Sequence, residues 1–374
     1  MYKKFLALVV FAGLIFACSS SGGGGGVDPG DDDVFVDNFD RGAMLTALAD
    51  QVITQAYDGF HTQMIMLNQA GMNFVAAPDQ TTLSNLRNGW FNAYKVWQYI
   101  EMFNIGKAEE LQYSFYMNVY PLSVTDVENN ITNGGYDLYA VGNQDAVGFP
   151  ALDYLLYGLA DNDADILAKY TTDANADGYK TYLTDVLTQM DDLTRLVVND
   201  WGEGYRDTFI NNSGNTSTSS LNILVNSFVQ YYEKKLRANK IGIPAGVFSG
   251  NPLPDKVEAL YRKNGSKELA EIALQAVEDF FNGKQYNGGA EAESFKTYLS
   301  YLDRDDISNN ILSQINTAQA QLNSLSNNFY EQVNTDNSQM LMTYDELQKV
   351  VVFIKNDMPN AFNVSIVFQD NDGD

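Results

Sequence analysis

Two acidic side chains in apolar surroundings, Glu101 and Asp153, are the residues of this chain best placed to do chemistry. Glu101 continues an apolar stripe at helical spacing, where a carboxylate costs free energy unless it is paired or binds a metal. The alternative is that the helix frays near residue 100 and leaves Glu101 in solvent. Asp153 is the only charge in an apolar segment, although the helix dipole alone also favours an acid near a helix N-terminus.

The chain has a single His, which excludes H-E-x-x-H proteases and every site that needs two imidazoles. That residue, His61, lies beside Phe60 in the first expected helix, where a structural or exposed role is typical. It could become a third ligand only if it faces the helix that carries Glu101.

Two further polar segments could bind ions. Residues 173–178, DANADG, match the start of a calcium loop, but Thr184 holds the twelfth position, so a polar turn with a capping Asp is favoured. The segment 234–244, KKLRANKIGIP, is the densest basic cluster. Its Arg237 and Lys240 could hold an anion or pair with carboxylates of the first domain. Cations are also enriched at helix C-termini without any ligand.

Helical periodicity predicts the elements that must position these residues. The first apolar stripe consists of Leu45, Leu48, Val52, Ala56, Phe60, Met64, Leu67 and Phe74. Pro78 ends that helix, and Asp79 can cap the next one, whose stripe is Leu83, Leu86, Trp90, Tyr94 and Trp97. Three later stripes come after residue 180: Leu183 to Trp201, Ile307 to Phe329, and a last one of Leu341, Tyr344, Leu347, Val351, Ile354 and Met358.

No segment shows sustained period-two alternation, so the chain is expected to be all-α. Stripes of this width are typical of antiparallel bundles. We divide the body near residue 200 into two helical-bundle domains packed side by side, 38–200 and 201–374.

The N-terminus predicts the compartment. Residues 1–17 combine Lys3 and Lys4 with a short apolar run, which is typical of a signal peptide. The run ends in IFAC, which resembles a bacterial lipobox, and the resemblance implies lipidation of Cys18. Residues 18–37 are rich in Ser, Gly and Asp and are expected to form a flexible tether. Ser19, where an inner-membrane retention signal would place Asp, favours the outer membrane, with the protein facing the periplasm or the cell surface.

The composition excludes some partners. The chain has 48 Asp+Glu against 23 Lys+Arg, a net charge of −25, which argues against nucleic-acid binding. A single Cys cannot form an internal disulfide. The hydrophobic fraction of 45% is enough for folded cores rather than a disordered acidic chain.

Several segments together resemble the imelysin family, in its branch of Bacteroidetes-type envelope lipoproteins. They are WQYIEMFNIG (97–106), the pair Tyr120-Pro121, GFPALDYLLYG (148–158) and the acidic end Asp370 to Asp374, in matching order over most of 40–374. The resemblance implies an all-helical fold of two bundle-like domains, a cell-envelope role in iron acquisition, and a peptidase label.

The family signature G-x-H-x-x-E falls on Gly148, Pro150 and Asp153. The glycine is kept, the His is Pro, and the Glu is the shorter Asp. Pro150 offers no ligand atom, so the resemblance leaves only Glu101, at the family's acidic position after the helix Trp, and Asp153 as metal ligands. If the two carboxylates meet, they form an oxygen-ligand site better suited to a divalent or ferric cation such as Ca²⁺, Mg²⁺, Mn²⁺ or Fe³⁺ than to catalytic zinc.

These patterns are compatible with three functions. We favour a non-catalytic binding lipoprotein that holds an iron species or metal between the two domains and serves uptake, with an outer-membrane transporter as partner. The first alternative is a metallopeptidase of the imelysin type, which the lost His disfavours. The second is a surface interaction lipoprotein without a small ligand.

Overall fold

The computed structural model describes residues 37–367. Cys18, the predicted signal peptide, the predicted tether up to residue 36 and the acidic end Asp370 to Asp374 lie outside the described residues. The chain divides into two units, Met1–Asn38 and Phe39–Asp374, and every described helix belongs to the second. No strand occurs in 37–367, which confirms the all-α prediction. No helix within that range is both long and apolar enough to cross a membrane.

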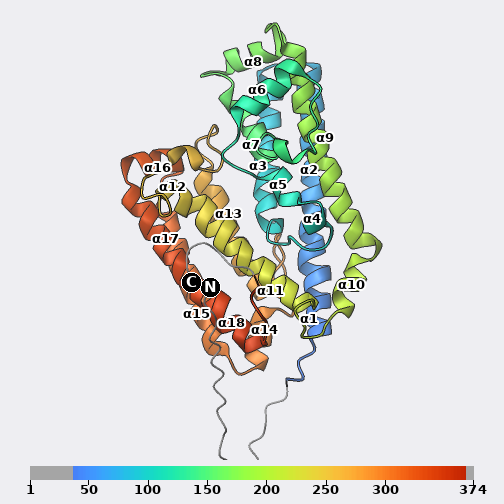
Figure 1. The fold of residues 1–374 in the computed structure, drawn as a ribbon, viewed down its shortest axis with the longest axis vertical. Helices are drawn as coiled ribbons and strands as arrows, with labels where there is room; N and C mark the ends of the chain where they lie inside the picture. The colour runs from blue at the N-terminus through green and yellow to red at the C-terminus, as the bar shows by residue number, and fades with distance from the viewer. Residues whose placement is uncertain (1–36, 368–374) are drawn as a thin grey trace, which may run out of the picture. The chain divides into compact units, whose positions relative to one another are not determined.

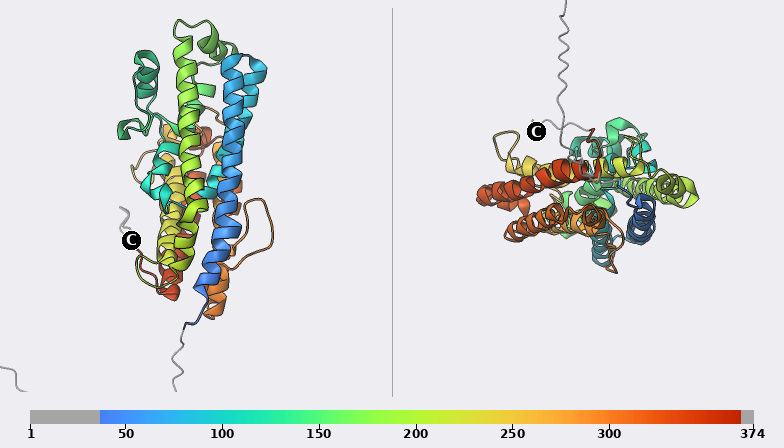
Figure 2. Two further views of the ribbon diagram at one scale, coloured as in Figure 1. Left: turned by 90° about the vertical axis from the view of Figure 1, so that its right-hand side faces the viewer. Right: turned by 90° about the horizontal axis from the view of Figure 1, so that it is seen from below.

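Three long helices form the first half of this unit (Figures 1 and 2). The chain enters through α1 (Arg41–Ala47) and a π-helical stretch, η1 (Leu48–Ile53), and continues into α2 (Thr54–Ala76). After the turn at Pro78, α3 (Gln80–Ile100) returns, and α9 (Ala176–Asp200) also packs against α2. Asp79 caps α3 as predicted, since its side chain accepts the N–H of Thr82 at 2.8 Å.

A second group of helices comes after residue 200. α13 (Ser266–Asn282), α15 (Asp305–Asn323) and α17 (Asn337–Val351) pack in sequence, and α17 also packs on η5 (Tyr231–Gly242). α13 lies against α3 of the first half, so the two groups share a packed boundary. The aromatic rings of Phe103 and Phe280 meet there, with centroids 5.3 Å apart.

Shorter elements connect these helices. In the first half they are α4 (Lys107–Glu110), α5 (Tyr113–Met117), α6 (Val124–Asn133), η2 (Val141–Asn143), α7 (Gly148–Asp153), η3 (Tyr154–Gly158) and α8 (Asp163–Thr171). In the second half they are η4 (Trp201–Tyr205), α10 (Arg206–Asn211), α11 (Ser220–Gln230), α12 (Ile243–Ala245), η6 (Pro254–Lys256), α14 (Phe295–Tyr301), α16 (Phe329–Thr335), η7 (Val352–Asp357) and α18 (Met358–Phe362).

The predicted stripes are the buried faces of these helices, with two departures. Every residue of the first two stripes is buried. In the last stripe Leu341 is 39% exposed, and its neighbour Met340 is buried instead. Met340 gives the stripe alternating spacings of four and three up to Val351, which stay on one helical face, whereas starting from Leu341 gives two successive spacings of three, which drift off it. α15 ends at Asn323, so Phe329 reaches the core from the start of α16.

The predicted boundary near residue 200 falls where α9 runs into η4, and the helix is kinked at Gly204, whose φ of +147° is non-helical. α9 passes directly into η4 at Trp201, without an intervening loop. The described residues from Phe39 to Val367 belong to one compact unit by their contacts. The division into 38–200 and 201–374 therefore stays an interpretation, and we use "N-terminal half" and "C-terminal half" for the described residues on either side of it.

Candidate functional site

Glu101 lies at the C-terminal end of α3, where the helix ends but the surrounding residues are still buried. The helix ends at Ile100, and Glu101 is its C-cap, with its N–H donating to Trp97 O at 3.0 Å. The side chain of Glu101 is nevertheless only 1% exposed. Each sequence interpretation is therefore partly right, because the helix stops near residue 100 while the carboxylate stays buried.

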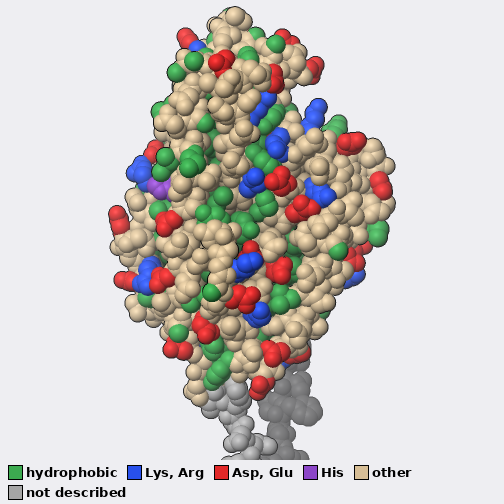
Figure 3. Space-filling view, turned by 180° about the vertical axis from the view of Figure 1, so that it is seen from behind, with side chains coloured by type: hydrophobic (Ala, Val, Ile, Leu, Met, Phe, Trp, Pro, Cys, Tyr) green, Lys and Arg blue, Asp and Glu red, His purple; other side chains and the backbone are tan. Residues whose placement is uncertain are grey.

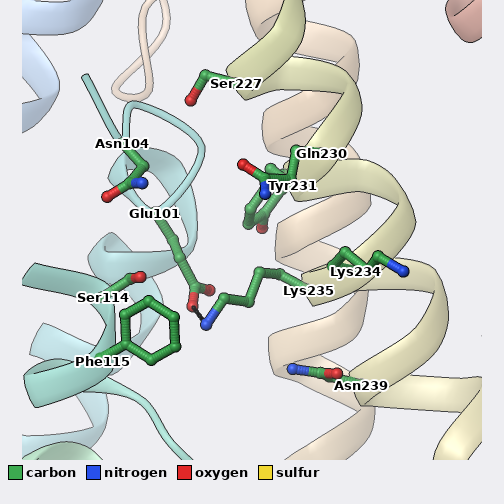
Figure 4. Close-up of a pocket in the computed structure, with 10 residues that line it drawn as sticks. All are labelled: Glu101, Asn104, Ser114, Phe115, Ser227, Gln230, Tyr231, Lys234, Lys235 and Asn239. Atoms are coloured by element: carbon green, nitrogen blue, oxygen red, sulfur yellow. Dashed lines mark ion pairs between the residues drawn. The ribbon is translucent and has the colours of Figure 1, made fainter. Parts of the chain in front are cut away.

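Glu101 lines a cavity of about 280 Å³ between the two halves, which we call the Glu101 cavity. One side comes from the end of α3, the loop after it and α5, and the other comes from α11 and η5 (Figure 4). Its lining residues are Glu101, Asn104, Ser114, Phe115, Ser227, Gln230, Tyr231, Lys234, Lys235 and Asn239. The cavity therefore joins segments more than 100 residues apart in the sequence.

Lys235 faces Glu101 across this cavity (Figure 4). Its Nζ lies 3.7 Å from Glu101 Oε1, which is an ion pair but longer than a hydrogen bond. Neither carboxylate oxygen of Glu101 has a hydrogen-bond partner within the described part of the chain. Burial raises the pKa of Glu101 above its ordinary value, and the ammonium groups of Lys235 and Lys240, together with the nearby Asn118 amide, oppose that rise.

A second buried ion pair lies next to the cavity. Lys240 Nζ is 2.6 Å from Glu258 Oε2, and both side chains are buried. The other oxygen of Glu258 accepts from Asn118 Nδ2 at 3.0 Å, and Asn118 Oδ1 accepts from the Tyr94 hydroxyl at 2.6 Å. This row of polar groups runs from α3 to η5 and links the two halves through their buried boundary.

Arg237 lies on the same helix as Lys240 but faces the other way, into the C-terminal half. Its guanidinium donates to the Tyr344 hydroxyl at 2.8 Å and to Gln348, and lies 3.9 Å from Glu233. Both Arg237 and Lys240 are buried and bind groups of this chain. Their predicted role in holding an external anion stays a prediction.

Asp153 is tied to the backbone of the C-terminal half. Its Oδ2 accepts the N–H of Tyr261 at 2.8 Å, and its Oδ1 accepts the N–H of Arg262 at 2.9 Å. Burial raises the pKa of Asp153 to about 7, although these two N–H groups favour the ionised form. Asp153 therefore acts as a clamp between α7 and the loop at 259–263.

The two other signature positions also serve the fold. Gly148 has φ +73°, and a Cβ there would lie 2.3 Å from the carbonyl oxygen of Met117. Only glycine fits at this position, because the neighbouring backbone lies too close for any side chain. Pro150 is buried in the first turn of α7, where its fixed φ suits a helix start and its missing N–H costs nothing.

The structure places Glu101 and Asp153 in separate surroundings. Glu101 lines the Glu101 cavity, whereas Asp153 lines a different, very small cavity beside Tyr120 and Pro150. Over residues 37–367, no group of three or more His, Cys, Asp or Glu side chains could hold a metal ion. With both Asp153 oxygens bound to backbone and Glu101 beside an ammonium, this donor set does not fit the metal that the family signature implies. The two-carboxylate metal site is left as an unsupported prediction.

His61 is half-buried on α2 and lines neither cavity. Its imidazole lies near Asp191 on α9, where burial raises the pKa of the Asp191 carboxyl and His61 opposes that rise. Figure 3, with this His in purple, shows acidic and basic side chains interspersed over that face rather than gathered in one patch. A ligand role for His61 remains a prediction without a neighbouring site.

The calcium-loop match at 173–178 forms the polar turn that begins α9. Asp173 Oδ2 lies 3.0 Å from Lys169 Nζ, and its Oδ1 accepts the N–H of Asn175 at 2.9 Å. α9 starts at Ala176, so the Asp and Gly at positions 177 and 178 are already helical. A helix start is thus the structural role of this segment.

Sequence reasoning missed the residues that complete the site. Lys235 was visible only as one member of a basic segment, and Glu258 gave no signal, because it sits among ordinary helix-forming residues. Asn118 and Tyr94 are likewise unremarkable in the sequence. Their roles depend on partners from another part of the chain.

The fold and the site together define the class of this protein. It is an all-helical protein with a cavity at the boundary between two groups of helices. The family model described as imelysin matches residues 53–351, and this chain belongs to the imelysin family. No curated protein is similar enough in sequence to count as a match.

Two solved structures share the fold. An imelysin-like protein from Psychrobacter arcticum 273-4 has a TM-score of 0.70 at 19% identity, covering 88% of this chain and 97% of that one. A candidate iron-regulated protein A precursor from Parabacteroides distasonis ATCC 8503 has a TM-score of 0.70 at 17% identity, covering 85% and 95%. At these identities the likeness shows the fold alone.

Proposed function

We propose that this protein is a non-catalytic binding lipoprotein of the outer membrane. It binds a small iron- or metal-containing ligand in the Glu101 cavity and serves the uptake of that iron or metal. The observation that carries the proposal is Glu101, a residue that lines the cavity and whose buried carboxylate makes no hydrogen bond within the described chain. A buried acceptor without a partner costs roughly 1–3 kcal/mol, and a bound ligand removes that cost.

The envelope and iron parts of the proposal have separate support. The lipobox-like sequence at Cys18 supports the membrane anchor. Membership of the imelysin family and the printed name of the Parabacteroides neighbour support a link to iron. An outer-membrane transporter is the partner that uptake would require.

The surroundings of Glu101 favour a metal chelate over a bare ion. The Lys235 ammonium lies 3.7 Å from the carboxylate, where it would repel a free cation. A chelate brings its own oxygen ligands and can present anionic groups to Lys235. The clamp made by Asp153 and the Pro at position 150 also favour binding over the metallopeptidase alternative, because both signature positions serve the fold.

Thermal unfolding and calorimetry of the full chain in detergent test this function, with ferric citrate, ferric ion, Ca²⁺ and haem as probes. We expect ferric citrate to raise Tm, because a ligand at 100 times its Kd adds about 2.7 kcal/mol of stability. Glu101→Gln should weaken binding at least about tenfold, the loss of one charged hydrogen bond. Glu291→Gln, at an exposed surface pair with Lys296, is the matched control and should bind normally. A Tm unchanged by every probe would contradict the proposal and favour the surface-interaction alternative.

A further inference from the structure

The Glu101 cavity brings a buried acceptor and a donor side by side, the Glu101 carboxylate and the Lys235 ammonium. Glu101 supplies two carboxylate oxygens without partners in the described chain. Lys235 lies 3.7 Å away, beyond hydrogen-bond distance, and its Nζ also lies 5.3 Å from the centre of the Phe115 ring. Lys234 also lines the cavity but points away from Glu101 (Figure 4).

The remaining walls suit a small organic molecule. The side-chain amides of Asn104, Gln230 and Asn239 line the cavity, and Phe115 and Tyr231 add aromatic surface. Binding sites for small molecules combine apolar walls with a few such polar groups. The volume of about 280 Å³ leaves room for a molecule larger than a single ion.

The charges of the pair select the ligand. A bare cation would satisfy Glu101 but meet the ammonium of Lys235, and a simple anion would satisfy Lys235 but meet the carboxylate. A ligand that suits both must give Glu101 a hydrogen bond and Lys235 a negative charge. Since the two protein groups are only 3.7 Å apart, the donor and the anionic group must be neighbours on the ligand.

We infer that the Glu101 cavity binds a small 2-hydroxy or 2-amino carboxylate, whose hydroxyl or ammonium donates to Glu101 while its carboxylate pairs with Lys235. This inference rests on the proposed binding function and names the ligand class. Carboxylate and hydroxyl oxygens also bind ferric ions, so a hydroxycarboxylate can enter alone or as the organic part of a ferric complex.

Calorimetry of the full chain with L-malate, L-aspartate and succinate tests the inference, because these four-carbon diacids differ only in the hydroxyl, ammonium or hydrogen at one carbon. We expect malate or aspartate to bind at least about tenfold more tightly than succinate, because a site built for a donor rejects an analogue that lacks it. The tighter of the two identifies the donor as a hydroxyl or an ammonium. Citrate against tricarballylate repeats the comparison on a larger skeleton.

Two variants test the roles of the pair. Glu101→Leu should abolish the preference over succinate, and Lys235→Met should weaken malate, aspartate and succinate alike by about tenfold or more. Lys349→Met, at an exposed lysine paired with Glu346, is the control and should leave binding unchanged. The comparison of diacids on the unmodified chain stands even if a variant fails to fold.

The outcomes separate the two proposals. Succinate binding as tightly as both substituted acids, or no binding by any of these acids, overturns the inference. If ferric citrate still binds through Glu101 while L-malate, L-aspartate and citrate alone do not, the ligand class is wrong and the binding function stands. If no probe binds, both proposals fail.

Discussion

The carboxylate of Asp153 accepts the backbone N–H of Tyr261 at 2.8 Å, across 108 residues of sequence. With the parallel bond from Arg262, it fastens α7 to a tight loop whose Ala259 and Lys263 both have positive φ. The residue at the family's signature acid thus serves here as a structural clamp between the two halves.

Replacing Asp153 by Asn should destabilise the protein at pH 5 by about 1–3 kcal/mol, because the amide keeps one acceptor and turns a second donor toward a backbone N–H. Chemical denaturation followed by circular dichroism measures this difference. Asp161→Asn, on the exposed connector before α8, is the control and should change stability little. Equal stability of the Asp153 variant and the unmodified protein would contradict the clamp.

The same residue predicts a pH dependence. Burial raises the pKa of Asp153 from 3.8 to about 7, so between these values the folded state keeps a proton that the unfolded state has lost. The stability from this proton is fully present below about pH 3.8 and is lost as the pH rises through 7. The advantage of the unmodified protein over Asp153→Asn should therefore shrink between pH 5 and 7, by at most about 1.4 kcal/mol per unit. A difference that does not change with pH would contradict this prediction.

The buried pair of Lys240 and Glu258 predicts a strong coupling. Lys240→Met should cost about 3–5 kcal/mol of unfolding free energy, because it leaves the Glu258 carboxylate buried without its cation. Adding Glu258→Gln should recover more than half of the loss, since Gln is neutral and still accepts from Asn118. Denaturant titration of the two single variants and the double variant checks this as a double-mutant cycle. Additive effects would mean that the two side chains are not coupled.

Gly148 is predicted to be irreplaceable. Gly148→Ala should destabilise the protein by more than about 3 kcal/mol or prevent folding, because a left-handed backbone strain adds to a clash with the Met117 carbonyl oxygen. Gly250→Ala is the matched control, since Gly250 has φ +72° but nothing within 4 Å of an added Cβ. It should lose only about 1–2 kcal/mol, the cost of the backbone conformation alone. Similar losses in both variants would remove the steric explanation.

Cys18 is predicted to anchor the protein. Cys18→Ser should prevent lipid attachment and release the protein from the membrane fraction, because no other cysteine is available. Mass spectrometry of the mature N-terminal peptide and cell fractionation measure the two effects. A serine variant that stays in the outer membrane would show that another feature holds the protein there.

Local patterns predicted the fold well. The stripes at 45–74 and 83–97 became buried helix faces, and Asp79 caps α3 with Thr82, because helix faces and caps depend on residues three or four apart. The last stripe was wrong at Leu341, where the position of neighbouring helices made Met340 the buried residue. A local pattern gives the width of an apolar face but leaves its rotation uncertain by about one residue.

The candidate site was predicted less well. The sequence indicated that Glu101 is unusual and that the signature acid had become Asp153, but it could not show that Lys235 faces the first and that backbone N–H groups bind the second. Arg237 and Lys240 were expected to hold an external anion or to pair with carboxylates of the first domain, whereas the structure pairs them with Glu233 and Glu258 of the C-terminal half.

The sequence by itself determined the helices, their caps, the glycine at position 148 and the family, because each depends on neighbouring residues or on an ordered set of segments. Only the tertiary structure decided which polar groups are paired. Partners such as Asp153 and Tyr261 lie far apart in the chain. Burial sets the free-energy cost of leaving either polar group without a hydrogen-bond partner. Hydrogen bonds within the fold offset that cost for Asp153, whereas the two buried oxygens of Glu101 make no hydrogen bond among the described residues.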